Sequence, residues 1–172
     1  ELSQGLLEVR ATGGDTYLGG EDIDLAIVHH LMEAFEKSDG ISLASDAMAL
    51  QRLKEAAEKA KVELSSAQQT AISLPFITMD DSGPKHLQEN LTRAKFEEMA
   101  QDLFERCKVP CTAAMKDAKM SPGDIDEVLL VGGSSRIPKV QEILSNFFGD
   151  HPLGVHLNAD EAPALGAAFE AA

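Results

Sequence analysis

The sequence is poor in aromatic residues and in cysteine. It has no tryptophan, one tyrosine and seven phenylalanines among 172 residues, so aliphatic side chains must fill most of its core. Its two cysteines, Cys107 and Cys111, are too few for a disulfide framework in a domain of this size, which favours a reducing compartment. No second pair of ligands accompanies them, so we interpret both as structural thiols and expect no metal site.

Long apolar runs and targeting signals are also absent. No run approaches the roughly 18 apolar residues that suggest a bilayer-spanning helix, so we expect no membrane partner. The chain opens at Glu1 without an initiator methionine, a basic region or a cleavage site. We therefore expect no targeting segment, and we expect this chain to be a piece of a longer protein.

Basic residues are scarce. Fifteen Lys and Arg stand against 29 Asp and Glu, which leaves a formal net charge of −14. A general nucleic-acid binder needs Lys and Arg to displace counterions from phosphates, so that class is excluded, and anionic membrane surfaces are disfavoured. The acidity is compatible with a basic protein partner but does not indicate a fold.

The hydrophobic pattern predicts a mixed α/β chain. We expect strands at residues 6–12, 70–79, 85–91 and 127–131, and helices that begin near residues 21, 47, 93, 138 and 158–160. Asp46 and Thr92 are predicted N-caps, Pro75 indicates an edge position or a bulge, and Pro110 should kink or break the third helix. The apolar stripe expected on the second helix comprises Met48, Leu53, Ala56, Ala57, Ala60 and Leu64.

The most informative stretch is residues 128–138, in which an apolar strand is followed by Gly132-Gly133, two serines and a helix start. Glycines let a backbone approach a ligand without a Cβ in the way, and the free N–H groups of a helix start favour an acceptor. Arg136 offers a planar face for stacking on a purine. A tight strand-to-helix turn with capping serines explains the same residues, and a lone Gly pair does not decide between the two interpretations.

A second candidate group lies on the helix that begins near residue 47. Glu58, Lys61 and Ser65 are spaced i, i+3, i+7, which places them on one helix face. By itself this pattern indicates a solvated charged face with a Glu58–Lys61 pair. The five histidines form neither an HExxH motif nor a catalytic-triad pattern.

Four blocks of the sequence, residues 14–22, 48–61, 128–138 and 158–168, resemble the seventy-kilodalton heat shock chaperones (the heat shock protein 70 family) among the actin-like ATPases. They occur in the family's order, and the resemblance covers the whole chain. Residues 61–66 and 74–78 look more like the bacterial and mitochondrial DnaK type than the eukaryotic cytosolic type.

The resemblance implies a binding site for ATP or ADP. The residues it places at the adenine and ribose are Gly132, Gly133, Ser134, Arg136 and Ile137. Glu58, Lys61 and Ser65 match residues that face the nucleotide across the family's cleft. Gly20 matches a position near the phosphates or the lobe hinge, and Asp160 matches an adenosine neighbour.

The last block departs from the family at Ala159 and Pro163. A proline is tolerated in the first turn of a helix, where its missing N–H has no intrahelical acceptor. We therefore predict a late start for the final helix, with Asp160 as its N-cap and Pro163 at the third position.

The resemblance also implies an architecture, an α/β actin-like ATPase lobe with an inserted α+β subdomain. The chain looks like the C-terminal lobe (lobe II) of the ATPase domain. Residues 1–18 and 101–172 are expected to form a ribonuclease H-like sheet with helices (IIA-like), and residues 19–100 the insertion (IIB-like). The family's phosphate loops and its catalytic Lys, Glu and Asp lie upstream of the matched region. We therefore expect no catalytic residues here, Mg²⁺ bound mainly by the missing half, and no activity from this chain alone.

By resemblance, the intact protein is a stress-response chaperone that couples ATP binding and hydrolysis to binding and release of unfolded polypeptide. This lobe would supply an adenosine-facing wall and a surface for a GrpE-like nucleotide exchange factor. A J-domain co-chaperone is the other expected partner, unfolded polypeptide would bind through a missing substrate domain, and the expected compartment is the bacterial cytoplasm or the mitochondrial matrix. The alternatives are a lobe of an actin-like sugar or acetate kinase, or a non-catalytic interaction module.

Overall fold

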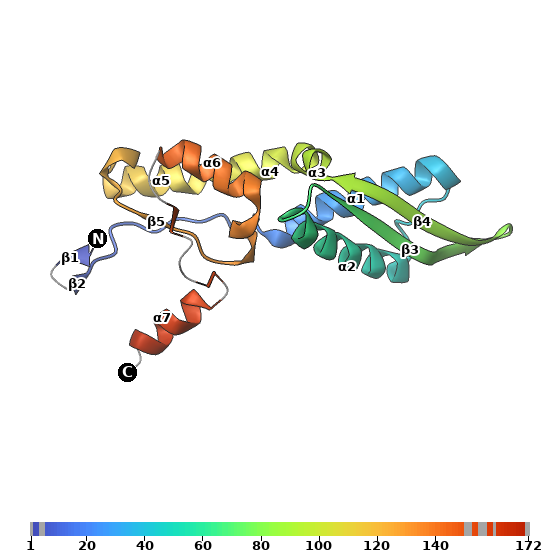
Figure 1. The fold of residues 1–172 in the computed structure, drawn as a ribbon, viewed down its shortest axis with the longest axis horizontal. Coiled ribbons are helices and arrows are strands. Elements are labelled where there is room, and N and C mark those ends of the chain that lie inside the picture. The colour runs from blue at the N-terminus through green and yellow to red at the C-terminus, as the bar shows by residue number, and fades with distance from the viewer. Residues whose placement is uncertain (1, 4–5, 150–152, 155–157, 160, 171–172) are drawn as a thin grey trace. The chain divides into compact units, whose positions relative to one another are not determined.

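The computed structural model describes residues 2–3, 6–149, 153–154, 158–159 and 161–170 (Figure 1). The chain folds as two compact units. One is continuous, Gly19–Leu103, and the other combines Glu1–Leu18 with Phe104–Ala172.

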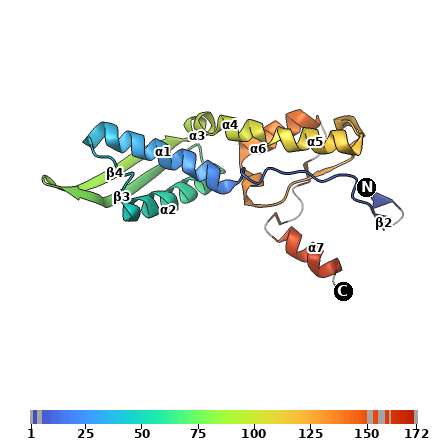
Figure 2. The ribbon, with the colours of Figure 1, turned by 180° about the vertical axis from the view of Figure 1, so that it is seen from behind.

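The continuous unit consists of helices packed on a β-hairpin. Its elements are α1 (Gly20–Asp39), α2 (Ala47–Leu64), β3 (Gln69–Asp80), β4 (Gly83–Thr92) and α3 (Arg93–Met99). Figures 1 and 2 show α1 and α2 lying side by side against the hairpin. The largest fully buried side chains of this unit are Phe35, Phe96, Ile27, Leu31, Leu43, Leu53, Leu64 and Leu91.

Local hydrogen bonds explain where the two long helices begin and end. The Asp22 carboxylate accepts a hydrogen bond from the Gly19 N–H at 2.8 Å, which satisfies a donor at the start of α1. Gly40 ends α1 in the left-handed region, at φ +72°. Asp46 Oδ1 accepts hydrogen bonds from the N–H groups of Met48 and Ala49, both at 3.0 Å, so the predicted N-cap of α2 is confirmed.

The predicted apolar stripe of α2 is wrong at Met48, which is exposed, and at Ala56, which is only half-buried. Met48 is 79% exposed, whereas Ala49 is fully buried. The buried stripe consists of Ala49, Leu53, Ala57, Ala60 and Leu64. Its spacing of three or four residues matches the helical period, and Met48 lies about 100° around the helix from Ala49, outside the buried stripe.

The hairpin carries the irregularity that Pro75 predicts. The register of β3 and β4 shifts between Leu74 and Thr78, since proline has no N–H for the ladder. Phe76, inside this bulge, has a φ of +53°. The Arg52 guanidinium donates hydrogen bonds to the carbonyl oxygens of Pro75 at 2.7 Å and Phe76 at 2.8 Å, so α2 holds the bulge in place.

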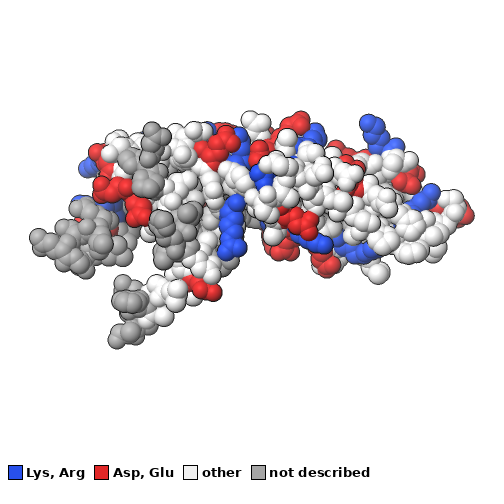
Figure 3. Space-filling model, in the orientation of Figure 1, with Lys and Arg blue, Asp and Glu red and all other residues white. Residues whose placement is uncertain are grey.

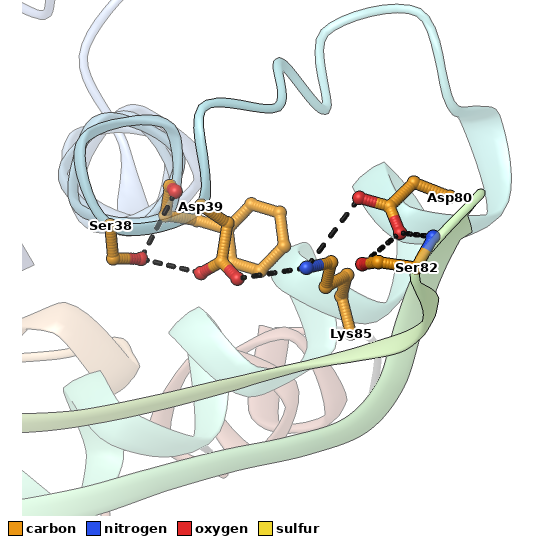
Figure 4. A network of polar contacts seen from close by, with 6 residues as sticks. Ser38, Asp39, Asp80, Ser82 and Lys85 are labelled. Carbon is orange, nitrogen blue, oxygen red and sulfur yellow. Dashed lines mark hydrogen bonds and ion pairs between the residues drawn. The ribbon is translucent and has the colours of Figure 1, made fainter.

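The tip of the hairpin is tied to the end of α1 (Figure 4). Lys85 Nζ lies 3.9 Å from Asp39 Oδ1 and 3.5 Å from Asp80 Oδ2. Ser82 donates to Asp80 Oδ1 through its N–H at 2.8 Å and its hydroxyl at 2.6 Å. These bonds lower the pKa of Asp80, which keeps the carboxylate charged for its partner Lys85.

The second unit contains short strands and several helices. Its elements are β1 (Leu2–Ser3), β2 (Leu6–Leu7), α5 (Lys108–Ala118), η1 (Pro122–Asp124), β5 (Val128–Leu129), η2 (Gly133–Arg136), α6 (Pro138–Phe148), β6 (Leu153–Gly154) and α7 (Ala162–Glu170), and α4 (Gln101–Arg106) crosses the boundary between the units. β1 pairs antiparallel with β2, and β5 pairs parallel with β6. The mixed α/β character predicted from the sequence is confirmed.

Two predicted strands of this unit are shorter than expected. The strand at residues 6–12 is regular only over Leu6–Leu7, and the run 127–131 is a strand only over Val128–Leu129. Leu129 and Val131 are 56% and 49% exposed, so the run is not a buried strand. Among the residues that the structure describes, β5 has β6 as its single neighbouring strand and pairs with it over two residues, so β5 is an edge strand and not the centre of a larger sheet.

The third predicted helix is interrupted at Ala100 and again at Cys107, not at Pro110 itself. Pro110 is the third residue of α5, where its missing N–H costs no intrahelical bond. The final helix, α7, begins at Ala162, so the predicted late start is confirmed, but Pro163 stands at its second position and not at the predicted third. The capping role of Asp160 lies outside the described residues. Across the described part of the chain, no helix combines the length and apolar character needed to cross a bilayer.

Candidate functional site

The predicted site residues divide between the two units. Gly20, Glu58, Lys61 and Ser65 belong to the continuous unit, and the group at Gly132–Ile137 belongs to the other. Asp160 lies outside the described residues. The geometry of each group is therefore defined within its own unit.

The first group is a tight turn between β5 and α6. Gly132 has a φ of +84°, which side chains with a Cβ rarely adopt, so glycine is required here. The Ser135 hydroxyl donates to the Gly132 carbonyl at 2.6 Å and closes the turn. Neither serine caps α6, which begins with Pro138 after Ile137 and has no side-chain cap. The Ser135 hydroxyl therefore stabilises the turn and not the helix start.

The turn presents some of its predicted residues and buries another. Gly132, Gly133 and Arg136 are exposed, and Ser134 is half-buried. Ile137 is only 2% exposed, so its side chain anchors the turn to the core of its unit. An exposed backbone beside an exposed guanidinium is suited to a flat ligand with hydrogen-bonding edges.

A segment more than twenty residues further along the chain lies against this turn. The Gly132 N–H donates to the Ala159 carbonyl at 2.7 Å. Arg136 Nη2 lies 3.5 Å from Asn158 Oδ1. Two of the sequence blocks that carry the family resemblance, residues 128–138 and 158–168, are therefore brought to one place by the fold.

The second group joins the start of α1 to the end of α2. Lys61 Nζ donates to Asp24 Oδ2 at 2.7 Å and to the Gly20 carbonyl at 3.1 Å. The Lys61 and Asp24 side chains are only 14% and 15% exposed. The expected Glu58–Lys61 pair is therefore wrong, because the ammonium is taken by a carboxylate of the neighbouring helix. The Ser65 hydroxyl donates to the Lys61 carbonyl at 3.2 Å, one turn back in the chain.

Sequence reasoning missed Asp24. Acidic residues in the first turns of a helix are explained by the helix dipole, and that local explanation hid a contact with a residue 37 positions away. Burial raises the pKa of Asp24, and it outweighs the lowering effect of Lys61; Glu58 and Glu21 raise the pKa further. One of its oxygens, Oδ1, is buried and has no hydrogen-bond partner.

Glu58 and Asp24 line a small acidic cavity between α1 and α2. Its volume is about 210 Å³, and its lining residues are Glu21, Asp24, Leu25, Gln51, Lys54, Glu55 and Glu58. Carboxylates outnumber ammonium groups around it, so this surface disfavours a phosphate. Elsewhere on the face shown in Figure 3, acidic side chains are dispersed among basic and uncharged ones.

Each of the two groups, within its own unit, offers hydrogen-bonding or charged atoms to a ligand. The Gly132–Arg136 turn provides exposed backbone and a planar cation, Glu58 provides an acceptor for hydroxyl groups, and Lys61 has three N–H donors, of which two are in use. Neither Cys107 nor Cys111 forms a disulfide, and burial raises the pKa values of both thiols. In the described ranges no three His, Cys, Asp or Glu residues gather as ligands of a metal ion would.

A comparison with known protein families extends this description to the whole chain. The family model described as "Hsp70 protein" matches residues 1–172. The match includes both groups of candidate site residues and all four sequence blocks described above.

Proposed function

Because this chain belongs to the Hsp70 family, whose members are ATP-binding chaperones, we propose that it is the C-terminal lobe of the actin-like ATPase domain of a DnaK-type member. Family membership makes the chain part of a chaperone nucleotide-binding domain. The lobe, the type and the residue roles below are the proposal. A sugar or acetate kinase lobe is not favoured by the family match.

The observation that carries the proposal is the turn at Gly132. Its positive φ and its hydrogen bond to Ala159 put the exposed backbone, Arg136 and the start of the last family block in one place. We assign adenine and ribose contacts to this turn, through Gly132, Gly133, Ser134, Arg136 and the backbone at Ile137, with Asp160 as a neighbour.

Glu58, Lys61, Ser65 and Gly20 are the proposed contacts from the other unit, and for them the support is the resemblance together with their chemistry. The acidic cavity that Glu58 lines suits the uncharged nucleoside and not the phosphates. The phosphates and Mg²⁺ would be held mainly by the half of the ATPase domain that this chain does not contain. When bound, ATP supplies the phosphoanhydride whose hydrolysis drives the chaperone cycle.

In the same proposal, the continuous unit corresponds to subdomain IIB and the other to subdomain IIA. The intact chaperone, in the bacterial cytoplasm or the mitochondrial matrix, would bind unfolded polypeptide through a separate domain. A GrpE-like exchange factor and a J-domain co-chaperone would regulate it, and the acidity of this chain is compatible with a basic J-domain surface.

The test compares the intact protein with the 172-residue chain. We expect the intact protein to bind a fluorescent ADP, and Arg136→Ala to weaken binding by about 0.5–2 kcal/mol, or roughly 2- to 30-fold in Kd, through the lost cation–π contact. Lys116→Ala, which removes a cation from the exposed face of α5, is the matched control and should leave Kd unchanged.

We expect no ATP hydrolysis above background from the 172-residue chain. Turnover by this chain alone would refute the assignment of the catalytic residues to the missing half. An intact protein that does not bind ADP, or whose Kd is insensitive to Arg136→Ala, would refute the proposed site. Binding of a GrpE-like factor would favour the chaperone over a chain that serves only as an interaction module.

A further inference from the structure

The ion pair between α1 and α2 places a residue without any assigned role beside a proposed nucleotide contact. Asp24 Oδ2 lies 2.7 Å from Lys61 Nζ, within charge-assisted hydrogen-bond distance. The Gly20 carbonyl accepts a second hydrogen bond from the same ammonium. Both side chains of the pair are largely buried, so solvent screens the contact less than it would a surface pair.

These two bonds leave the ammonium little freedom. A lysine ammonium has three N–H donors, and here two of them are directed at fixed acceptors on the first turns of α1. The third donor is therefore held in a restricted range of directions before any ligand arrives. A lysine on an open helix face would have to lose its side-chain freedom at the moment of binding.

We propose that Asp24 is a positioning residue for nucleotide recognition, which holds the Lys61 ammonium so that its remaining donor is available to the nucleoside. This inference rests on the proposed function, because it takes Lys61 as a nucleotide contact. It adds a residue that belongs to none of the motifs and that contacts the ligand only through Lys61.

The charges around the Asp24–Lys61 pair indicate which part of the nucleotide Lys61 contacts. Asp24 compensates the charge of Lys61, and the carboxylates of Glu21 and Glu58 raise the pKa of Asp24 from nearby, one from each helix. Asp24 also lines the acidic cavity together with Glu21 and Glu58. Lys61 is therefore paired with a carboxylate that has further acidic groups beside it, which leaves Lys61 a poor partner for a phosphate but a good donor to a neutral oxygen or nitrogen. Loss of the Asp24 carboxylate should accordingly weaken the binding of adenosine and of ADP by the same factor.

The experiment measures Kd for fluorescent ADP and, by competition, for adenosine on the intact protein. The variants are Asp24→Ala, the isosteric Asp24→Asn, Lys61→Ala and the double variant Asp24→Ala/Lys61→Ala. Glu98→Gln is the matched control, because it removes the carboxylate of the exposed Lys95–Glu98 pair in the same unit. Thermal unfolding of each variant identifies the fraction that is folded at the assay temperature.

We expect Asp24→Ala to raise Kd about three- to tenfold for both ligands, as is typical for the release of one ordered long side chain. Asp24→Asn should cause a smaller rise, since the amide oxygen still accepts a hydrogen bond from Lys61. Glu98→Gln should leave Kd unchanged. In the Lys61→Ala background, Asp24→Ala should add nothing, because the residue it positions is already gone.

Two results would overturn the role of Asp24 but leave Lys61 as a nucleotide contact. In the first, Lys61→Ala raises Kd but Asp24→Ala does not. In the second, Asp24→Ala raises Kd by the full amount even in the Lys61→Ala background. The second would indicate a general structural role. An unchanged Kd in Lys61→Ala overturns the inference together with the assignment of Lys61, and the Arg136→Ala measurement then decides separately whether the turn at Gly132 binds nucleotide.

Discussion

The N-cap of α2 offers a sharp test of the forces that hold the candidate site, because α2 carries Glu58, Lys61 and Ser65. Asp46 is the perturbed residue. Its Oδ1 accepts from two backbone N–H groups, and none of the residues in the first turn of α2 is acidic. Asp46 therefore supplies both the cap and the nearest negative charge for the helix dipole.

The magnitude follows from what each N–H meets once the carboxylate is removed. Met48 is 79% exposed, so water can replace its bond, whereas Ala49 is fully buried and its N–H is left poorly satisfied. Asp46→Ala should therefore lower the free energy of unfolding by about 1–2 kcal/mol, the upper part of the range for loss of an N-cap. Asp46→Asn keeps the acceptor and loses only the charge–dipole contribution, about 0.3–1 kcal/mol.

Urea unfolding followed by circular dichroism measures both variants. With a slope of about 1–3 kcal/mol per molar urea, Asp46→Ala should lower the midpoint by roughly 0.3–2 M, and Asp46→Asn by less. An Asn variant as unstable as the Ala variant would refute the capping argument, since Asn caps as well as Asp. A midpoint unchanged in both would show that the two hydrogen bonds do not contribute to stability.

Two further predictions concern the core and an ion pair. Leu53→Ala should lower the free energy of unfolding by about 2–5 kcal/mol, because Leu53 is fully buried. Met48→Ala, five residues earlier in the same helix but exposed, should change it by less than about 0.5 kcal/mol in the same urea assay. Equal effects would contradict the buried stripe of α2. The N–H of Tyr17 and the guanidinium of Arg106 lower the pKa of Asp15 in the folded chain. The charged carboxylate therefore stabilises the fold fully at pH values above 3.8, the pKa in the unfolded chain. This contribution is lost as the pH falls through the lowered pKa. The melting temperature of the wild type should therefore exceed that of Asp15→Asn at neutral pH, and the two melting temperatures should converge in acid. A difference that stays constant across pH would contradict a stabilising role for the Asp15 charge.

Much of the local structure could be predicted because its causes lie within a few residues. The N-caps at Asp46 and Thr92, the bulge at Pro75 and the helix start at Pro138 each follow from one side chain and the backbone beside it. The strand at residues 127–131 could not be predicted in this way. Its apolar composition is typical of a buried strand, but burial depends on neighbours that the local sequence does not specify.

The candidate site was predictable in part. The Gly132 turn is a local motif, and its positive φ is the reason for the glycine. The contact between Gly132 and Ala159 and the pair between Lys61 and Asp24 connect residues far apart in the chain, so no spacing rule indicates them. Lys61 shows the consequence most clearly, because its nearest acid in the helix pattern, Glu58, is not its partner.

Two features of the sequence determined what kind of chain this is: the scarcity of aromatic residues, and the four sequence blocks. They make it an aliphatic-cored α/β chain of the Hsp70 family. The tertiary structure alone decided which carboxylate holds Lys61, which side of α2 is buried and which segment closes on the Gly132 turn. The physical reason is that hydrogen bonds within a turn or cap depend on adjacent residues. Burial and ion pairing between elements depend instead on how separate helices and strands pack.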